Sequence, residues 1–364
     1  MQKARYGSYI VVVLIAAFSI FLGTASAQKS DNVGQPIYKA EPLNKALQHT
    51  ATTIPYFSSS FTWNGTTYPY TMVGTDPAAG AGRSYVPVTI IPIKVVFANG
   101  VNLDGGSKAS LTIDSPIFQD AQFESGKTQY GDAIQRAEFW GQVESLNAPG
   151  YHVLLDQPRL APTQTIVVPQ NQGTEFTGSV SQAPIGLVSY SWWSSRIQNL
   201  VSSLKIDPRT VPVFLTYNTL LYIQSPSNCC VIGYHGGASS ANGNGVQQVN
   251  TYMWASWTDP KIFSVPIEDI NALSHEMAEW MNDPFVQNVV PAWSVPSEPQ
   301  YGCSNYLEVG DPLVGVVFTV TTNGYKYHPQ DEAFLPWFAK TSSTSYKGRY
   351  TYLGTFMTYS PGCS

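Results

Sequence analysis

The sequence predicts an α+β fold, in which a β-rich domain carries a few amphipathic helices packed on a mixed sheet. The composition supports this, because 13% of the residues are aromatic and the chain contains 29 glycines and 26 prolines. Runs of β-branched and aromatic residues recur between residues 61 and 356, as expected for strands. Three segments have apolar residues near helical spacing and predict helices: 130–143, 191–204 and 266–283.

The N-terminus has the pattern of a secretory signal. Two basic residues precede an apolar run over 9–22, and the small-residue stretch 25–27 has the form that a signal peptidase reads. We expect residues 1–27 to be removed, which leaves a secreted or periplasmic protein without a stable membrane anchor. An uncleaved anchor is the alternative, but the apolar run is short for a membrane span.

The rest of the chain predicts an arm followed by one domain. Residues 28–60 are polar and irregular, and we expect an N-terminal arm lying on the domain, with a short helix at 43–48. Residues 61–364 predict a single α+β domain, or two lobes that meet at the helix 266–283. The net charge of −5 and the absence of any Lys/Arg run argue against nucleic acid as a partner.

Several strands can be predicted along this domain. A hairpin is expected over 61–73, because an Asn-Gly pair interrupts alternating aromatic residues. The run 85–98 is the strongest strand of the first half, and its two prolines limit it to an edge or to irregular pairing. Residues 225–245 predict a loop of small residues. The other strands are expected at 151–154, 165–168, 211–223 and 247–257, with a second hairpin at 314–328.

Four cysteines predict disulfides in an oxidising compartment: Cys229, Cys230, Cys303 and Cys363. A bond between the adjacent Cys229 and Cys230 would be strained. We therefore expect each of these two to pair with one of the other two. Zinc binding by the cysteines is the weaker alternative, because no C-x-x-C pair occurs.

The segment 271–284, NALSHEMAEWMNDP, concentrates ionisable residues in a chain of which only 12% is charged. On a helix that turns by ~100° per residue, His275, Glu276, Glu279 and Asp283 fall on one face. The opposite side is apolar and is expected to pack on the core: Leu273, Met277, Trp280 and Met281. The helix thus presents one imidazole and three carboxylates together.

Residues 275–279 have the form H-E-x-x-E, which resembles the H-E-x-x-H helix of zincin metallopeptidases. The resemblance implies that His275 and Glu279 ligate zinc and that Glu276 activates the metal-bound water. Glu279 replaces the second histidine of the zincin motif. A carboxylate is an acceptable zinc ligand, but added oxygen ligands also favour Ca²⁺ or Mn²⁺.

The third metal ligand stays open at this point. The downstream acids Glu308 and Asp311 resemble the third carboxylate of gluzincins and aspzincins, and we prefer Glu308. Asp283 is a further candidate, although an acid before a proline more often ends a helix. In the predicted loop 225–245, His235 is a candidate donor to a transition-state oxyanion, and loop structure alone is the alternative role.

The wider pattern, SHEMAEWMNDPF followed by EVGD, resembles secreted proteins distantly similar to the plant phosphate-induced (EXORDIUM-like) family. This resemblance covers the last third of the chain and implies an extracellular or cell-wall setting. We therefore expect a secreted, zincin-like metallohydrolase, with a peptidase as the preferred type. It would act on a peptide or on a cell-wall or extracellular polymer. Two alternatives stay open: a non-enzymatic cell-surface or matrix protein with a structural metal site, and a glycan-acting enzyme using Glu279 and Glu308.

Overall fold

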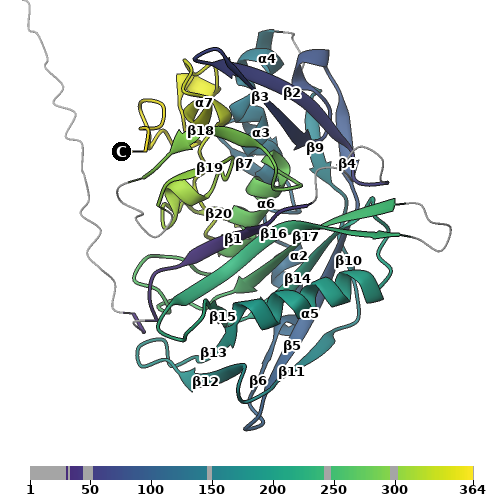
Figure 1. The fold of residues 1–364 in the computed structure, drawn as a ribbon, viewed down its shortest axis with the longest axis vertical. Coiled ribbons are helices and arrows are strands. Elements are labelled where there is room, and N and C mark those ends of the chain that lie inside the picture. The colour runs from purple at the N-terminus through teal and green to yellow at the C-terminus, as the bar shows by residue number, and fades with distance from the viewer. Residues whose placement is uncertain are drawn as a thin grey trace, which may run out of the picture.

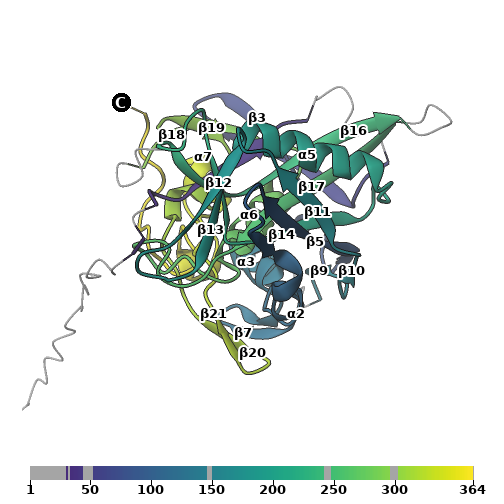
Figure 2. The same cartoon turned by 90° about the horizontal axis from the view of Figure 1, so that it is seen from below.

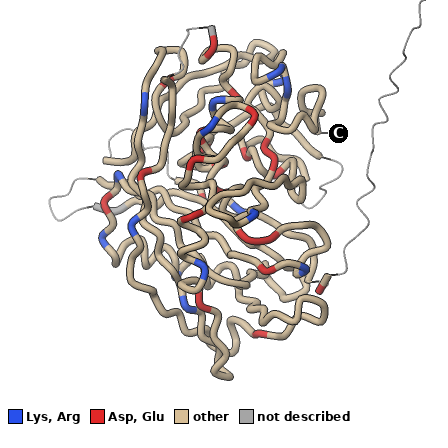
Figure 3. Tube along the Cα trace, turned by 180° about the vertical axis from the view of Figure 1, so that it is seen from behind, with Lys and Arg blue, Asp and Glu red and all other residues tan. Residues whose placement is uncertain are grey.

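The structure, a computed structural model, describes residues 30–31, 33–43, 52–145, 150–241, 247–295 and 302–363. The expected signal segment and the expected helix at 43–48 fall outside these residues, apart from Leu43. Among the described residues, no helix is both long and apolar enough to cross a membrane. Figure 3 shows the lysines and arginines scattered along the described chain rather than gathered on one element.

A mixed, eleven-stranded sheet forms the centre of the molecule (Figure 1). Its path begins with Arg159–Leu160 (β10), Val88–Phe97 (β5), Val211–Tyr217 (β14) and Gln247–Trp257 (β17). It continues through Cys229–Ala241 (β16), Thr219–Tyr222 (β15), Pro184–Ser189 (β13) and Gly173–Thr177 (β12). Three further strands pair with members of this path: Ile37–Glu41 (β1) with β16, and Asn102–Asp104 (β6) and Gln164–Val168 (β11) with β5. This sheet and its few helices confirm a β-rich α+β fold.

Two long helices lie against opposite faces of the sheet. Asn271–Asn282 (α6) packs on β16 and β17, and Tyr130–Glu138 (α3) packs on α6 from outside. Tyr190–Ser203 (α5) covers the other face, where Trp193 and Ile197 join the core beneath it. Figure 2 shows the sheet between α5 and α3. The shorter helices are Ala109–Ile113 (α2), Trp140–Ser145 (α4) and Leu335–Ala339 (α7).

Small two-stranded sheets surround α6 on the side away from the main sheet (Figure 1). The hairpin predicted over 61–73 is confirmed, with a turn at Asn64-Gly65. The hairpin predicted at 314–328 is shorter and turns at Asn323-Gly324. The pairs are Tyr56–Trp63 (β2) with Thr66–Val73 (β3), Arg83–Val86 (β4) with His152–Leu155 (β9), Ala121–Phe123 (β7) with Gly126–Thr128 (β8), Val289–Trp293 (β18) with Ser304–Tyr306 (β19), and Val320–Thr322 (β20) with Tyr325–Tyr327 (β21).

Of the two possibilities predicted for the run 85–98, the edge position is wrong and irregular pairing is confirmed. The run divides at Pro87 into β4 and β5, and β5 lies inside the main sheet between β14 and the pair β10 and β11. Pro92 pairs with Leu215 of β14. On the other side of β5, the partner changes from β10 at Ile90 to β11 at Ile93. Pro92 falls in this gap, so its missing N–H interrupts no ladder there.

The predicted loop 225–245 is also wrong over most of its length. Residues 229–241 form β16, a strand that pairs with β17, β15 and β1. The glycines made this strand hard to predict from residue propensities, because glycine is depleted in strands. Here they are required by close packing. A Cβ at Gly233 would lie 2.6 Å from Glu276 Oε1, and one at Gly236 would lie 2.7 Å from the Cβ of Glu41.

The helix predicted over 266–283 begins later, at Asn271. Glu268 and Asp269 therefore precede the helix instead of lying in its first turn. Asp269 has a positive φ of 49°, and its N–H donates to the carbonyl of Thr258 in an isolated bridge. That bridge takes the backbone away from helical geometry before the helix starts.

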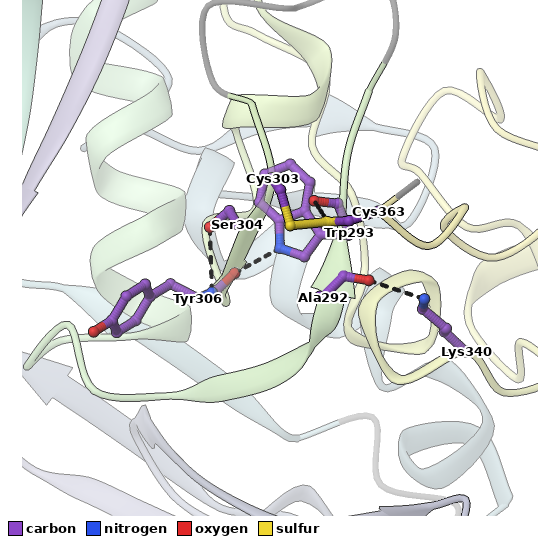
Figure 4. Close-up of a disulfide and its surroundings, with 7 residues drawn as sticks. All are labelled: Ala292, Trp293, Cys303, Ser304, Tyr306, Lys340 and Cys363. Atoms are coloured by element: carbon purple, nitrogen blue, oxygen red, sulfur yellow. Dashed lines mark hydrogen bonds between the residues drawn. A yellow bond between two sulfur atoms is a disulfide. The ribbon is translucent and has the colours of Figure 1, made fainter.

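The disulfide expectation was wrong as well. Cys229 bonds to its neighbour Cys230, across a cis peptide that places their Cα atoms 3.1 Å apart. Cys303 bonds to Cys363 and ties the chain end to the segment that follows α6 (Figure 4). Beside this bond, the indole N–H of Trp293 donates to the carbonyl of Tyr306 and links β18 to β19.

Candidate metal centre

Helix α6 is buried over its whole length, including the face that carries the ionisable residues. His275 and Glu276 are completely buried, and Glu279 is 1% exposed. Buried carboxylates need a compensating partner, because removal from water strongly disfavours their charged form. In the described part of the chain, lysines and arginines form ion pairs only with other acids: Glu124, Asp207 and Asp259.

Three of the predicted ligands come together at one point. His275 Nε2 lies 3.1 Å from Oε1 of Glu279, one helical turn away, and 3.7 Å from Oδ1 of Asp311. Asp311 opens the short 3₁₀ turn Asp311–Leu313, which places it opposite α6. Ligand atoms about 2.0–2.1 Å from a tetrahedral zinc ion lie roughly 3.3 Å from one another. The spacing and the donor set therefore fit a zinc ion held by these three residues.

A second group shares Glu279 with the first. In β16, His235 places Nδ1 3.1 Å from Glu276 Oε2 and 3.5 Å from Glu279 Oε2. Its other nitrogen, Nε2, lies 3.3 Å from the carbonyl oxygen of Asp283. Both ring nitrogens are engaged, so this arrangement leaves His235 no N–H for the oxyanion role considered from the sequence.

The proton between His235 and Glu276 can be placed from their surroundings. Burial lowers the pKa of His235 to about 4, so the ring is neutral at pH 7. Its Nε2–H then donates to the Asp283 carbonyl, and Nδ1 is an acceptor. Burial and the charge of Glu279 raise the pKa of Glu276 well above its ordinary value. The metal-free arrangement is therefore a protonated Glu276 that donates to His235 Nδ1.

The remaining acidic candidates take other positions. The pKa of Glu308 is raised well above its ordinary value by burial and by the charge of Glu279, to which its carboxyl group is hydrogen-bonded. Glu308 is thus a neighbour of Glu279, and it does not join the group around His275. The Asp283 side chain accepts from the backbone N–H groups of Gln287 and Asn288 at 2.8 and 2.9 Å. It fixes the turn after α6, as expected for an acid before proline.

Residues far along the chain hold His275 and were missed from the sequence. Gln330 Nε2 lies 3.0 Å from His275 Nδ1 and donates to the carbonyl of Gly310 at 2.8 Å. In this orientation Nδ1 accepts, which puts the imidazole proton on Nε2. A metal at Nε2 requires that proton on Nδ1 and the amide turned over, so that Gln330 Oε1 accepts it. Oε1 makes no hydrogen bond in the present orientation.

Gly310 is part of the same support. Its N–H donates to Glu279 Oε1 at 3.1 Å, and a Cβ at this position would lie 2.4 Å from Nδ1 of His275. The glycine in the EVGD sequence was the one available signal for this contact. No spacing rule connects Gln330 to a helix 48 residues earlier.

Two further buried groups adjoin the metal centre. Glu332 is completely buried and accepts a hydrogen bond of 2.8 Å from the hydroxyl of Tyr130 on α3. Its pKa is raised well above the ordinary value by burial and, in part, by the charges of Glu279 and Asp311. On the other side, the ring of Tyr38 stacks on the ring of His275. Neither residue lies in a recognisable motif.

Unpartnered atoms gather at this centre. Among the described residues around it, the buried side-chain atoms that make no hydrogen bond include Glu276 Oε1, Glu308 Oε2, Gln330 Oε1 and Glu332 Oε2. Buried polar atoms in proteins are almost always hydrogen-bonded. A divalent cation would compensate both the unpartnered atoms and the buried negative charge.

His328 lies in a different cluster. Its Nδ1 is 2.7 Å from Asp269 Oδ2 and 3.2 Å from Glu268 Oε1. The three residues have metal-ligating atoms within reach of one another. However, Asp269 is already satisfied by His328 and by the N–H groups of His328 and Ile270. This cluster is a hydrogen-bonded link between the start of α6 and the end of β21.

Comparison with family models, with curated proteins and with solved structures finds no match to this chain.

Proposed function

We propose that this protein is a secreted, metal-dependent hydrolase with a zincin-like centre, acting on peptides. His275, Glu279 and Asp311 would hold a divalent cation, with zinc ahead of calcium or manganese because one ligand is an imidazole nitrogen. The observation that carries the proposal is the convergence of these three residues, whose ligating atoms all lie within 4.8 Å of one another. Asp311 thereby replaces Glu308 as the preferred third ligand.

The neighbouring residues suit the chemistry of hydrolysis. A bound zinc ion would supply Lewis acidity, which polarises a carbonyl group and lowers the pKa of a water molecule. Glu276 follows His275 directly. Beside a bound cation its carboxyl group would be ionised and would take the proton from the attacking water. His235 holds the Glu276 carboxyl group through Nδ1 and is itself fixed by the Asp283 carbonyl. The chain thus provides a base and a residue that orients it.

A structural metal site in a non-enzymatic extracellular protein is the second candidate. The burial of the whole centre favours it, because a catalytic metal needs an open position for substrate. Described cavities of about 720, 480 and 460 Å³ are lined by other residues. For the glycan-acting alternative, the hydrogen bond between Glu279 and Glu308 is unfavourable, since their carboxyl groups are too close to flank a sugar bond.

Metal analysis and one conservative variant test the proposal. Protein purified without added metal is loaded with Zn²⁺, Mn²⁺ or Ca²⁺, and bound metal and peptide hydrolysis are measured. We expect one ion per chain, lost in His275→Asn and kept in the matched control His328→Asn. Glu276→Gln should keep the metal and lose hydrolysis. Metal binding without hydrolysis in any form of the protein would leave the structural site as the better interpretation, and no metal uptake would exclude both.

A further inference from the structure

The N-terminal arm enters the sheet beside the metal centre. Strand β1 pairs in parallel with β16, and its register places Tyr38 opposite Gly233 and Ala40 opposite His235. β15 pairs with the earlier part of β16, at Cys229 and Val231. Beyond that point, β1 covers the edge of β16 that runs past the metal centre.

Tyr38 fills the space directly over the centre. Its ring lies 3.5 Å from the His275 ring, centroid to centroid, with the planes 12° apart. Its hydroxyl donates to Asn271 Oδ1 at 3.2 Å, and the residue is 2% exposed. The pKa of Tyr38 is raised well above its ordinary value by burial, and next by the charges of Glu276 and Glu332. The stacked ring therefore covers His275, a ligand of the proposed metal ion.

Both ends of β1 are fixed by polar contacts. Before it, the carbonyl of Gln35 accepts from the N–H of Cys230 at 3.1 Å. At its end, the Glu41 carboxylate accepts from four side chains that lie on the opposite face of the sheet: Tyr190, Ser194, Gln198 and Tyr252. Gly236 and Gly237 allow the arm to lie this close, since a Cβ on Gly237 would come within 2.9 Å of Leu43.

We propose that β1 is an autoinhibitory strand and that the ring of Tyr38 is a plug, that is, a side chain that closes the site over His275. The arm is bound along a strand edge as an extended peptide would be, with main-chain pairing and one inserted side chain. Displacement of residues 37–41 would expose β16 over Gly233–Gly236 and open the space over His275. That space accepts an aromatic ring, so the peptide that replaces β1 carries an aromatic residue at the position of Tyr38. The inference about the replacing peptide rests on the proposed function, whereas the closure of the site by Tyr38 does not.

Access to His275 can be measured without metal or turnover. The metal-free full chain is treated with diethyl pyrocarbonate, and labelling of His275 is followed by peptide mapping, with His152, whose side chain is 17% exposed, as internal reference. We expect Tyr38→Ala to label at His275 at least about tenfold faster, because the stacked ring no longer closes the site. Glu41→Gln should act in the same direction, since an amide oxygen cannot accept from all four donors. Lys39→Ala, at an exposed position of the same strand, is the matched control.

The outcomes distinguish the closure of the site by Tyr38 from the proposed peptide hydrolysis. Faster labelling of His275 in Tyr38→Ala and Glu41→Gln, slowed again by a synthetic peptide of residues 35–43, supports the plug even if no variant hydrolyses peptides. Hydrolysis that rises together with labelling supports both proposals. Unchanged labelling in the folded variants overturns the plug. Should Tyr38→Ala fail to fold, hydrogen exchange on the wild type decides: exchange of the β1 amides only by global unfolding contradicts a displaceable strand.

Discussion

Nδ1 of His235 lies 3.1 Å from Oε2 of Glu276, and this contact joins strand β16 to helix α6 inside the core. Burial lowers the pKa of the imidazole to about 4 and raises the pKa of the carboxyl group well above its ordinary value. The contact explains why a glycine is needed at position 233, since a side chain there would collide with Glu276. From this contact we expect His235 to position the base rather than to ligate the proposed ion.

We expect His235→Leu to keep bound metal and to lower the kcat of peptide hydrolysis by about ten- to a hundredfold. The leucine cannot accept from Glu276, so the carboxyl group loses the contact that orients it. Metal content and kcat are measured together, with Glu276→Gln as reference. Loss of metal in parallel with activity would instead place His235 among the ligands.

The third ligand can be decided by two isosteric substitutions. Asp311→Asn is expected to weaken metal affinity by at least about tenfold, because it removes a charged donor 3.7 Å from His275 Nε2. Glu308→Gln should leave affinity nearly unchanged, since Glu308 contacts Glu279 rather than the metal position. Competition with a chromogenic chelator measures both. The reverse ranking would restore the preference drawn from the sequence.

Two glycines provide a steric test of the same geometry. Gly310 has an ordinary φ of −86°, so alanine is allowed by the backbone and acts only through its Cβ, 2.4 Å from His275 Nδ1. Gly310→Ala is expected to displace the imidazole and weaken metal binding. Gly233→Ala, with its Cβ 2.6 Å from Glu276 Oε1, should keep the metal and lower kcat. Equal effects of the two substitutions on metal affinity would argue against separate roles for His275 and Glu276.

The sequence predicted the part of the centre that lies on one helix. His275, Glu276 and Glu279 are neighbours on α6, and their grouping follows from helical periodicity alone. The groups brought by tertiary structure could not be found in this way, because Tyr38 and Gln330 approach from 237 residues before and 55 residues after His275. The H-E-x-x-E spacing also gave no sign that the polar face is buried.

The errors in the fold have a common cause. Local propensity disfavours a strand that contains Gly233, Gly236 and Gly237, but each glycine makes room for a close neighbour in the folded sheet. Similarly, a proline such as Pro92 favours an edge strand, yet this one lies inside the sheet, where two partner strands of β5 meet. Asp269 is an acid of the kind that favours the first turn of a helix, but its backbone forms an isolated β-bridge with Thr258 instead. In each case a tertiary contact overrides a preference that holds on average.

Glu138 gives a prediction that is independent of the metal centre. It lies on α3, is 3% exposed, and accepts from the N–H of Leu335, while its Oε2 makes no hydrogen bond. Burial raises its pKa to about 8, whereas an unfolded glutamate titrates near ~4.3. The folded state therefore holds an extra proton between these values. Stability from this group is complete below about pH 4 and is lost as the pH rises towards 8.

Glu138→Gln should remove this dependence, because the amide keeps the shape and the acceptor without ionising. Urea unfolding from pH 4 to pH 9 measures the effect. The variant should match the wild type near pH 4 and exceed its free energy of unfolding by a few kcal/mol above pH 8. Glu124→Gln is the control, since Glu124 is paired with Lys347 and Arg349 and its pKa is lowered, chiefly by its hydrogen bond with Lys347. A constant difference between Glu138→Gln and wild type across the pH range would show that Glu138 ionises no differently in the folded chain.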